Sequence, residues 1–236
     1  IVGALRGNEI QQLYICSQLV KALKELEAHG AISHNHEILV IPSVNRFSMN
    51  VGKRFWPTDN SDINRAFPGD VNGDTTKQIA GTLFDRIKGY SYGIHFASFY
   101  MPGDFIPHVK MMDTGFQSAS LANLFGLQYV VIRKPKPMDT VTLNYNWQMS
   151  GTSAFSIYTN CSDYIDDVSA KQAVASILRF LTRMGIIKYN NHSGFIAEVI
   201  NEDNMTPILS GAAGFYKRLC DPVSYTHLTL PTTERV

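Results

Sequence analysis

The sequence contains little cysteine. Its three cysteines, Cys16, Cys161 and Cys220, are far apart among 236 residues, and no two of them form a Cys-x-x-Cys pair. Neither a disulfide framework nor a zinc cluster held by thiolates is therefore indicated. This use of cysteine is typical of the reducing cytoplasm, where we expect the chain to act.

A large charge of one sign and long apolar runs are also missing. A formal net charge of +1 creates no long-range field, so neither nucleic acid nor an anionic membrane surface is expected as a partner. No apolar run approaches the roughly 20 residues that span a bilayer, and the first residues lack the pattern of a signal peptide. With 44% hydrophobic residues, the chain has the composition of a globular protein.

Short apolar runs alternate with segments of helical periodicity over most of the chain. The runs predict strands at residues 1–4, 37–41, 92–96, 129–132 and 154–158. Helices are predicted between Asn8 and Gly30 and over residues 75–88, 118–125 and 169–184. Helices between successive strands favour βαβ units, so we predict an α/β fold with a mainly parallel or mixed sheet and helices on both faces.

The pattern changes near the end of the chain. Beyond His192, strand-like pieces at 195–200 and 214–219 are separated by Gly, Asn and Pro. Because Ile1 opens directly on an apolar run without an initiator Met, we also expect upstream residues to be missing. The expected division is a catalytic-type domain at 1–190, the start of a small β domain at 191–222, and a non-native tail at 223–236.

The long segment from Pro42 to Gly69 is rich in Asn, Pro, Gly and Asp and has no sustained period. A stretch of this kind inside a compact domain is usually functional or disordered. Arg54, Asn64 and Arg65 within it could bind a substrate carboxylate, because guanidinium groups bind carboxylates in a bidentate manner. The alternative is that Asp62 and an arginine only brace the loop.

Two residues of metal-ligand type lie at the ends of predicted strands. Glu9 follows the first strand and His95 lies in the third. Ligands of open α/β sheets collect at the carboxyl ends of strands, and a catalytic zinc usually has three protein ligands. The alternative is a glutamate stabilised by a helix N-terminus and a buried, hydrogen-bonded histidine.

Three motifs together resemble those of one family. They are Gly-Ala-Leu-Arg-Gly-Asn-Glu at 3–9, Asp-Ile-Asn-Arg-Ala-Phe-Pro-Gly at 62–69, and Gly-Ile-His at 93–95 with Pro-His-Val at 107–109. In order and approximate spacing they resemble the catalytic domain of the succinylglutamate desuccinylase and aspartoacylase family, over most of residues 1–190. The resemblance implies a zinc carboxypeptidase-like fold, one zinc ion, and hydrolysis of an amide or ester bond in a small carboxylate-bearing N-acyl amino acid or similar substrate. It also implies a small β domain at the C-terminus.

Position by position, the resemblance assigns roles to five residues. It assigns Glu9 and His95 to the zinc ion. It assigns Asn64 and Arg65 to the substrate carboxylate, with Arg54 as a further substrate-facing arginine.

Two positions depart from the family's pattern. Arg6 stands where the family has a histidine zinc ligand, three residues before Glu9, and a guanidinium has no lone pair with which to bind a metal. Its charge would repel a dication or pair with Glu9. Tyr158 stands where the family usually has a glutamate as general base. A phenol with an ordinary pKa near ~10 is a poor base at neutral pH, although it can donate a hydrogen bond to an oxyanion.

Several other residues of suitable type have no spacing that selects them. They are His34, His36 and His108 as replacement zinc ligands and Glu198 and Glu202 as replacement bases. The glutamates would reach the site only if the β domain folded back over it. We interpret the acidic cluster Asp163, Asp166 and Asp167, which precedes a predicted helix, as capping residues rather than metal ligands.

Two functions remain open at this point. The first is a zinc-dependent hydrolase in which Glu9 and His95 hold the ion with an unidentified third ligand, and the arginines orient the substrate carboxylate. The second is a catalytically impaired family member that binds a carboxylate ligand or regulates another protein, with an Arg6–Glu9 ion pair at the zinc position. A third, blander possibility is a damaged gene product.

Overall fold

The computed structural model describes residues 1–99, 105–190, 194–206 and 211–214, without the side chain of Glu202. The helices are α1 (Ile10–Ala28), α2 (Arg46–Asn50), α3 (Thr75–Ile87), α4 (Ala119–Asn123), α5 (Leu143–Met149) and α6 (Asp167–Arg183), with 3-10 turns η1 (Ile63–Arg65), η2 (Pro137–Asp139) and η3 (Glu202–Asn204). The strands are β1 (Val2–Ala4), β2 (Ile41–Ser43), β3 (Tyr92–Ala97), β4 (His108–Met112), β5 (Tyr129–Arg133), β6 (Ser153–Tyr158) and β7 (Glu198–Asn201). Within the described ranges, none of the helices combines the length and apolarity needed to cross a membrane.

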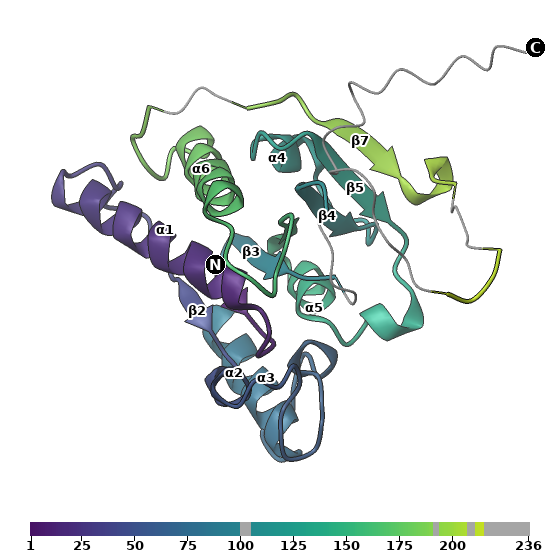
Figure 1. Cartoon of the computed structure of the whole chain (residues 1–236). Coiled ribbons are helices and arrows are strands. Elements are labelled where there is room, and N and C mark those ends of the chain that lie inside the picture. Colours follow the sequence, from purple (N-terminus) through teal and green to yellow (C-terminus); the bar gives the residue numbers. More distant parts are fainter. Residues whose placement is uncertain (100–104, 191–193, 207–210, 215–236) are drawn as a thin grey trace, which may run out of the picture.

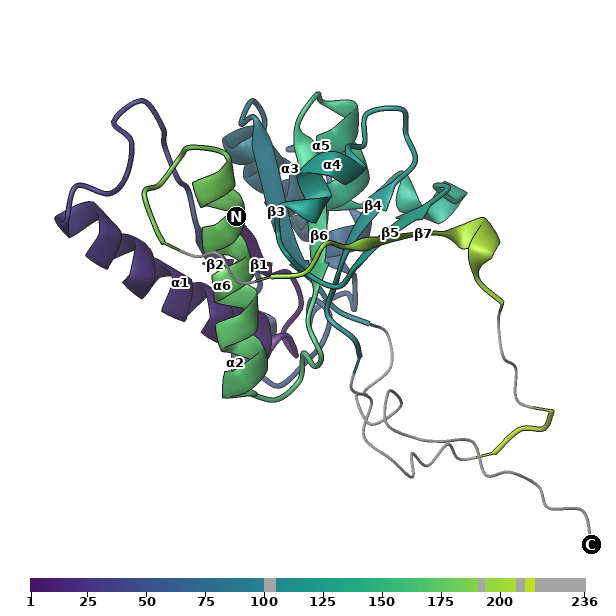
Figure 2. The same ribbon diagram turned by 90° about the horizontal axis from the view of Figure 1, so that it is seen from above.

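The seven strands form one sheet in the order β2-β1-β3-β6-β4-β5-β7 (Figures 1 and 2). Strands β4 and β6 run antiparallel, and the other neighbouring pairs of this sheet are parallel. Helices cover both faces, with α1 and α6 on one side and α3 and α5 on the other (Figures 1 and 2). The predicted α/β class with a mixed sheet is therefore confirmed.

The alternation of side chains along the central strands separates the main core from the opposite face of the sheet. Ile94 in β3 and Phe155 in β6 are paired neighbours that pack into the core with α1 and α6. His95 and Ser156, one residue further along each strand, are also paired and face the other way, because successive side chains of a strand point to opposite faces. This second face carries the polar groups described below.

The second strand begins later than the sequence predicts. The apolar run at 37–41 indicates a strand there, whereas β2 covers Ile41–Ser43. The reason is its partner: β1 begins at Val2, which pairs with Ile41, so the residues before Ile41 have no strand beside them. Strand pairing, rather than apolarity, sets the start of β2.

The irregular segment at 42–69 contains two short helical elements that the periodicity does not reveal. Asn45 accepts a hydrogen bond from the backbone N–H of Ser48 and begins α2. Asp62 accepts one from the N–H of Asn64 and begins η1. Capping side chains thus organise this loop, and they place Arg65 at the end of η1.

Two further elements, β4 and α5, are absent from the prediction. Strand β4 is short and mixes polar with apolar residues, so no apolar run marks it. Helix α5 has seven residues, too few for a helical period to stand out. Trp147 of this helix is 1% exposed and packs with Leu143 in a second core beneath α3.

The strand-like piece predicted at 195–200 corresponds to β7, which pairs in parallel with β5 as the edge strand of the main sheet. The piece predicted at 214–219 lies outside the described residues except for Gly214, and the tail at 223–236 lies wholly outside them. The division into domains therefore stays a prediction.

Within the acidic cluster before α6, Asp166 is the N-cap of this helix, as predicted. Its Oδ1 atom accepts a hydrogen bond from the N–H of Val168 at 3.0 Å, and its Oδ2 atom accepts one from Asn160 at 2.6 Å. Loss of an N-cap carboxylate typically costs about 1 kcal/mol, so we expect Asp166→Ala to lower the free energy of unfolding in urea by that amount. Asp163→Ala, which removes an exposed carboxylate of the same cluster, should change it by less than about 0.5 kcal/mol. Equal effects of the two substitutions would contradict this assignment.

Candidate functional site

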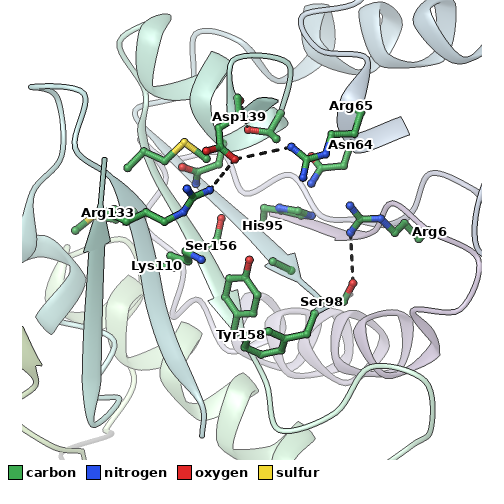
Figure 3. Close-up of a pocket in the computed structure, with 16 residues that line it drawn as sticks. Arg6, Asn64, Arg65, His95, Ser98, Lys110, Arg133, Asp139, Ser156 and Tyr158 are labelled. Carbon is green, nitrogen blue, oxygen red and sulfur yellow. Dashed lines mark hydrogen bonds and ion pairs between the residues drawn. The ribbon is translucent and has the colours of Figure 1, made fainter. Parts of the chain in front are cut away.

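A polar cavity of about 230 Å³ lies over the face of the sheet opposite α1 and α6 (Figure 3). It is lined by Arg6, Asn64, Arg65, His95, Ala97, Ser98, Phe99, Lys110, Met111, Met112, Arg133, Asp139, Thr142, Asn144, Ser156 and Tyr158. Four of these residues are cationic and one is a carboxylate, so the wall favours an anionic occupant.

The floor of the cavity follows from the pairing of the strands. Ser156 of β6 pairs with His95 of β3 on one side and with Lys110 of β4 on the other. These three side chains therefore form one row across the sheet, and Tyr158 begins the next row on the same face. The antiparallel orientation of β4, which the sequence does not reveal, brings Lys110 into this row.

Arg6 lies at one end of the cavity in a network of buried ion pairs. Its side chain is 5% exposed, and its Nη2 atom is 2.8 Å from Asp62 Oδ2, while Nη1 is 3.2 Å from Glu9 Oε1. Nη1 also donates to the hydroxyl of Ser98 at 3.4 Å. Burial disfavours the charged guanidinium, but Glu9 and Asp62 outweigh it and raise the pKa of Arg6 above its ordinary value. The ion pair between Arg6 and Glu9 that the sequence suggests is therefore present.

Glu9 lies behind Arg6 rather than on the cavity wall. It is fully buried, and its Oε2 atom accepts hydrogen bonds from the N–H groups of Leu5 and Arg6, both at 2.9 Å. Its Oε1 atom is bound by Arg6 and by the hydroxyl of Ser98. Both oxygens of this carboxylate are thus already in use.

The side chains at this end of the cavity do not fit a zinc site. The position of a third ligand is held by Arg6, which has no lone pair to offer, and the guanidinium contacts the carboxylate oxygen that a metal would need. In the described part of the chain, no three His, Cys, Asp or Glu side chains are grouped as metal ligands. Bringing Glu9 to a metal would require breaking its contact with Arg6.

His95 lines the cavity with a free ring nitrogen. The side chain is 2% exposed, and its Nε2 atom is buried without a hydrogen-bond partner. Burial and the nearby charge of Arg6 lower the pKa of His95 to about 3, so the imidazole is neutral at pH 7. Asn144 on α5 also lines the cavity, and both atoms of its buried amide have no partner.

Tyr158 forms part of an aromatic wall. Its ring is stacked on His108 with centroids 4.9 Å apart and lies 4.6 Å from the ring of Phe99. Burial raises the pKa of Tyr158 above its ordinary value, so the phenol is protonated at neutral pH. It can donate a hydrogen bond into the cavity, but it is not a base there.

The residues expected to hold a carboxylate are only partly together. Asn64 and Arg65 line the cavity, and the Oδ1 atom of Asn64 accepts a hydrogen bond from the N–H of Leu143 at 3.1 Å. Arg54 is not part of the lining. Its guanidinium donates to the carbonyl of Phe99 at 3.3 Å.

Three charged residues of the cavity were missed by sequence reasoning. Lys110 and Arg133 come from β4 and β5, and Asp139 ends η2. Burial would raise the pKa of Asp139, but the hydrogen bond from Arg133 and the other nearby donors keep it below its ordinary value. The sequence offered a signal for Arg133, since a charge directly follows the apolar run at 129–132, at the carboxyl end of a predicted strand.

The remaining candidates from the sequence lie away from the cavity or play other roles. His34 and His36 are exposed, as is Glu198 on the edge strand β7. His108 stacks on Tyr158, and burial lowers its pKa. Of Glu202 the structure describes the backbone alone.

A mixed sheet with helices on both faces and a cavity with four cationic side chains over its central strands defines an α/β protein. The chain belongs to the succinylglutamate desuccinylase/aspartoacylase family, because the model of that family's catalytic domain matches residues 1–157. The matched proteins named below include hydrolases that remove acyl groups, so the family-level expectation of a deacylase is supported.

Individual relatives are distant and longer than this chain. The N-alpha-acetyl-L-2,4-diaminobutyric acid deacetylase of Halomonas elongata is 28% identical over 87 residues, which are 37% of this chain and 23% of that protein. Among solved structures, the product-bound ectoine utilization protein EutE (DoeB) of Ruegeria pomeroyi has a TM-score of 0.68 at 21% identity, covering 85% of this chain and 60% of its own. The succinylglutamate desuccinylase/aspartoacylase of Rhodobacter sphaeroides has a TM-score of 0.67 at 19% identity. This match also covers 85% of this chain and 60% of the Rhodobacter chain. The chain thus spans less than two thirds of these proteins.

Proposed function

We propose that this chain binds a small carboxylate-bearing N-acyl amino acid or similar molecule in the cavity and that it does so without a metal ion. The family suggests the class of ligand, and the charged and polar side chains that line the cavity suggest how the ligand is bound. Hydrolysis of the family's type is not part of this function, because Tyr158 replaces the expected base and Arg6 replaces an expected zinc ligand.

The observation that carries the proposal is the position of the Arg6 guanidinium. It is buried between Glu9 and Asp62 and forms ion pairs with both carboxylates, which have little exposure of their own. A dication brought to Glu9 would be repelled by this fixed positive charge. If Arg6 moved away to admit the dication, Asp62 would lose its partner. The Arg6 guanidinium therefore supplies a fixed positive charge beside Glu9, where the resemblance would place a metal ion.

Unpaired polar atoms in the cavity support a polar ligand. Nε2 of His95 and the amide of Asn144 are buried without partners, and such groups cost free energy unless a ligand or water binds them. The amide and carboxylate of an N-acyl amino acid offer both donors and acceptors for them. The neighbouring cations favour the carboxylate.

The test is calorimetric titration of the full chain with N-acetyl-L-alanine, N-acetyl-L-glutamate and the corresponding neutral amides. We expect the acids to bind with an affinity that EDTA does not change, the amides to bind at least tenfold more weakly, and no free amino acid to form. Because a carboxylate contacts charged donors, its loss should cost about 1.5–3 kcal/mol of binding. Equal affinity for acids and amides would overturn the proposal.

The second candidate is the zinc-dependent deacylase that the family suggests. One observation favours it, namely the free Nε2 atom of His95, which is the kind of nitrogen that binds zinc. This candidate requires stoichiometric zinc in purified, untagged protein and release of an amino acid that EDTA abolishes. If elemental analysis finds no zinc and Arg6→His does not create a zinc site, it is wrong.

A further inference from the structure

We propose that Arg133 is the second arginine of the ligand site and that it forms with Arg65 a clamp for one carboxylate of the ligand. This inference rests on the proposed function, since it assigns residues to the same cavity. Arg65 comes from η1 and Arg133 from the end of β5, so the two sides of the clamp are 68 positions apart in the sequence, the difference between residues 133 and 65.

The two guanidinium groups already share one carboxylate oxygen. Arg133 Nη2 is 2.6 Å from Oδ1 of Asp139, and Arg65 Nη1 is 3.8 Å from the same atom. Figure 3 shows Asp139 between them, with one arginine reaching it from each side. Two cations that reach a single oxygen are close enough to bind the two oxygens of one further carboxylate.

Asp139 holds the clamp in place without saturating it. Its Oδ2 atom accepts a hydrogen bond from the N–H of Lys136 at 2.8 Å, which fixes the carboxylate on its turn. Each guanidinium has five N–H donors, more than the contacts to Asp139 and the one from Arg65 to the carbonyl of Met138 require. The two arginines and Asp139 carry a net charge of +1, which one ligand carboxylate neutralises.

Arg54 is less suited to this role. Its guanidinium lies 5.6 Å from the ring centre of Phe55, and it donates to the carbonyl of Phe99 rather than lining the cavity. Arg133 lines the cavity directly, and 18% of its side chain is exposed. The position is therefore suited to contact a ligand from the β5 side.

The experiment measures the affinity of the full chain for N-acetyl-L-alanine and N-acetyl-L-alaninamide by calorimetry. We expect Arg65→Gln and Arg133→Gln each to weaken binding of the acid at least tenfold and to leave binding of the amide within about twofold. Arg133→Lys should recover only part of the affinity, because an ammonium cannot bind a carboxylate in the bidentate manner. Arg183→Gln, at the exposed end of α6, is the matched control and should bind like the unaltered chain.

A second variant guards against a purely structural effect. Arg133→Gln leaves Asp139 with one fewer partner, so the double variant Arg133→Gln, Asp139→Asn removes the buried charge as well as the cation. We expect it to unfold at the same temperature as the unaltered chain within a few degrees, yet still to bind the acid at least tenfold more weakly. Affinity restored in the double variant would overturn the clamp.

The outcomes separate the inference from the proposed function. If no acid binds the unaltered chain, the proposed function fails. If the acid binds and Arg65→Gln weakens it while Arg133→Gln does not, the clamp is wrong and the proposed function stands. If Arg54→Gln weakens binding of the acid and Arg133→Gln does not, the clamp is likewise wrong and the proposed function stands.

Discussion

Replacing Arg6 with methionine is expected to destabilise the chain by about 3–5 kcal/mol, because it leaves buried carboxylates without their cation. Glu9 is fully buried, and the side chain of Asp62 is 9% exposed, so water cannot replace the guanidinium. Methionine fills a similar volume, which keeps the loss electrostatic rather than a matter of packing. The free energy of unfolding in urea measures the effect.

A matched control is available on the surface. Lys77 forms an ion pair of 3.2 Å with Asp74, but these side chains are 54% and 50% exposed. Because exposed pairs contribute little, Lys77→Met should cost less than about 1 kcal/mol. If Arg6→Met costs no more than this control, Arg6 does not supply the fixed positive charge beside Glu9 that we propose.

Features that depend on the local pattern of one segment were predictable from the sequence. The long helices, including α1 and α6, carry apolar residues at helical spacing, and the periodicity predicts them within a few residues. The capping role of Asp166 follows from a carboxylate just before such a helix. These features are encoded within one segment of chain, so one sequence suffices to find them.

Features that depend on pairing between distant segments were not predictable in the same way. Strand β4 has no apolar run of its own, and its antiparallel pairing with β6 places Lys110 beside Ser156. The loop before α5 brings Asp139 to Arg65, which lies far from it in the sequence. Nothing in the local pattern of either segment specifies these contacts.

The candidate site likewise contains residues whose positions the motifs predicted and one whose position they did not predict. The motifs placed His95, Asn64 and Arg65 near one another, and all three line the cavity. The motif also drew attention to Glu9, yet its side chain lies behind Arg6, because the guanidinium fills the space between that carboxylate and the cavity. Arg6, at the position where the resemblance places a metal ligand, therefore determines how Glu9 is oriented.

Stability is expected to fall as the pH is lowered from about 6.5 toward 4.5, because His95 cannot take up a proton while it is buried beside Arg6. The pKa of His95 is lowered to about 3 in the folded chain, whereas an unfolded histidine has a pKa near ~6.5. Between these values the unfolded chain binds one more proton than the folded chain, so the free energy of unfolding rises with pH in this window. The slope approaches about 1.4 kcal/mol per pH unit for one proton.

The measurement is urea unfolding at half-unit steps of pH, with EDTA present so that no metal contributes. His95→Gln should remove this part of the slope, since glutamine does not titrate, while His36→Gln, at an exposed position, should leave the slope as it is in the unaltered chain. The comparison is confined to pH values above 4.5 because carboxylates titrate below it. A slope that is as steep in His95→Gln as in the unaltered chain would assign the pH dependence to other groups, among them His108, whose pKa burial also lowers. It would then remove the argument that the imidazole is kept neutral by burial and by the Arg6 charge at the metal position.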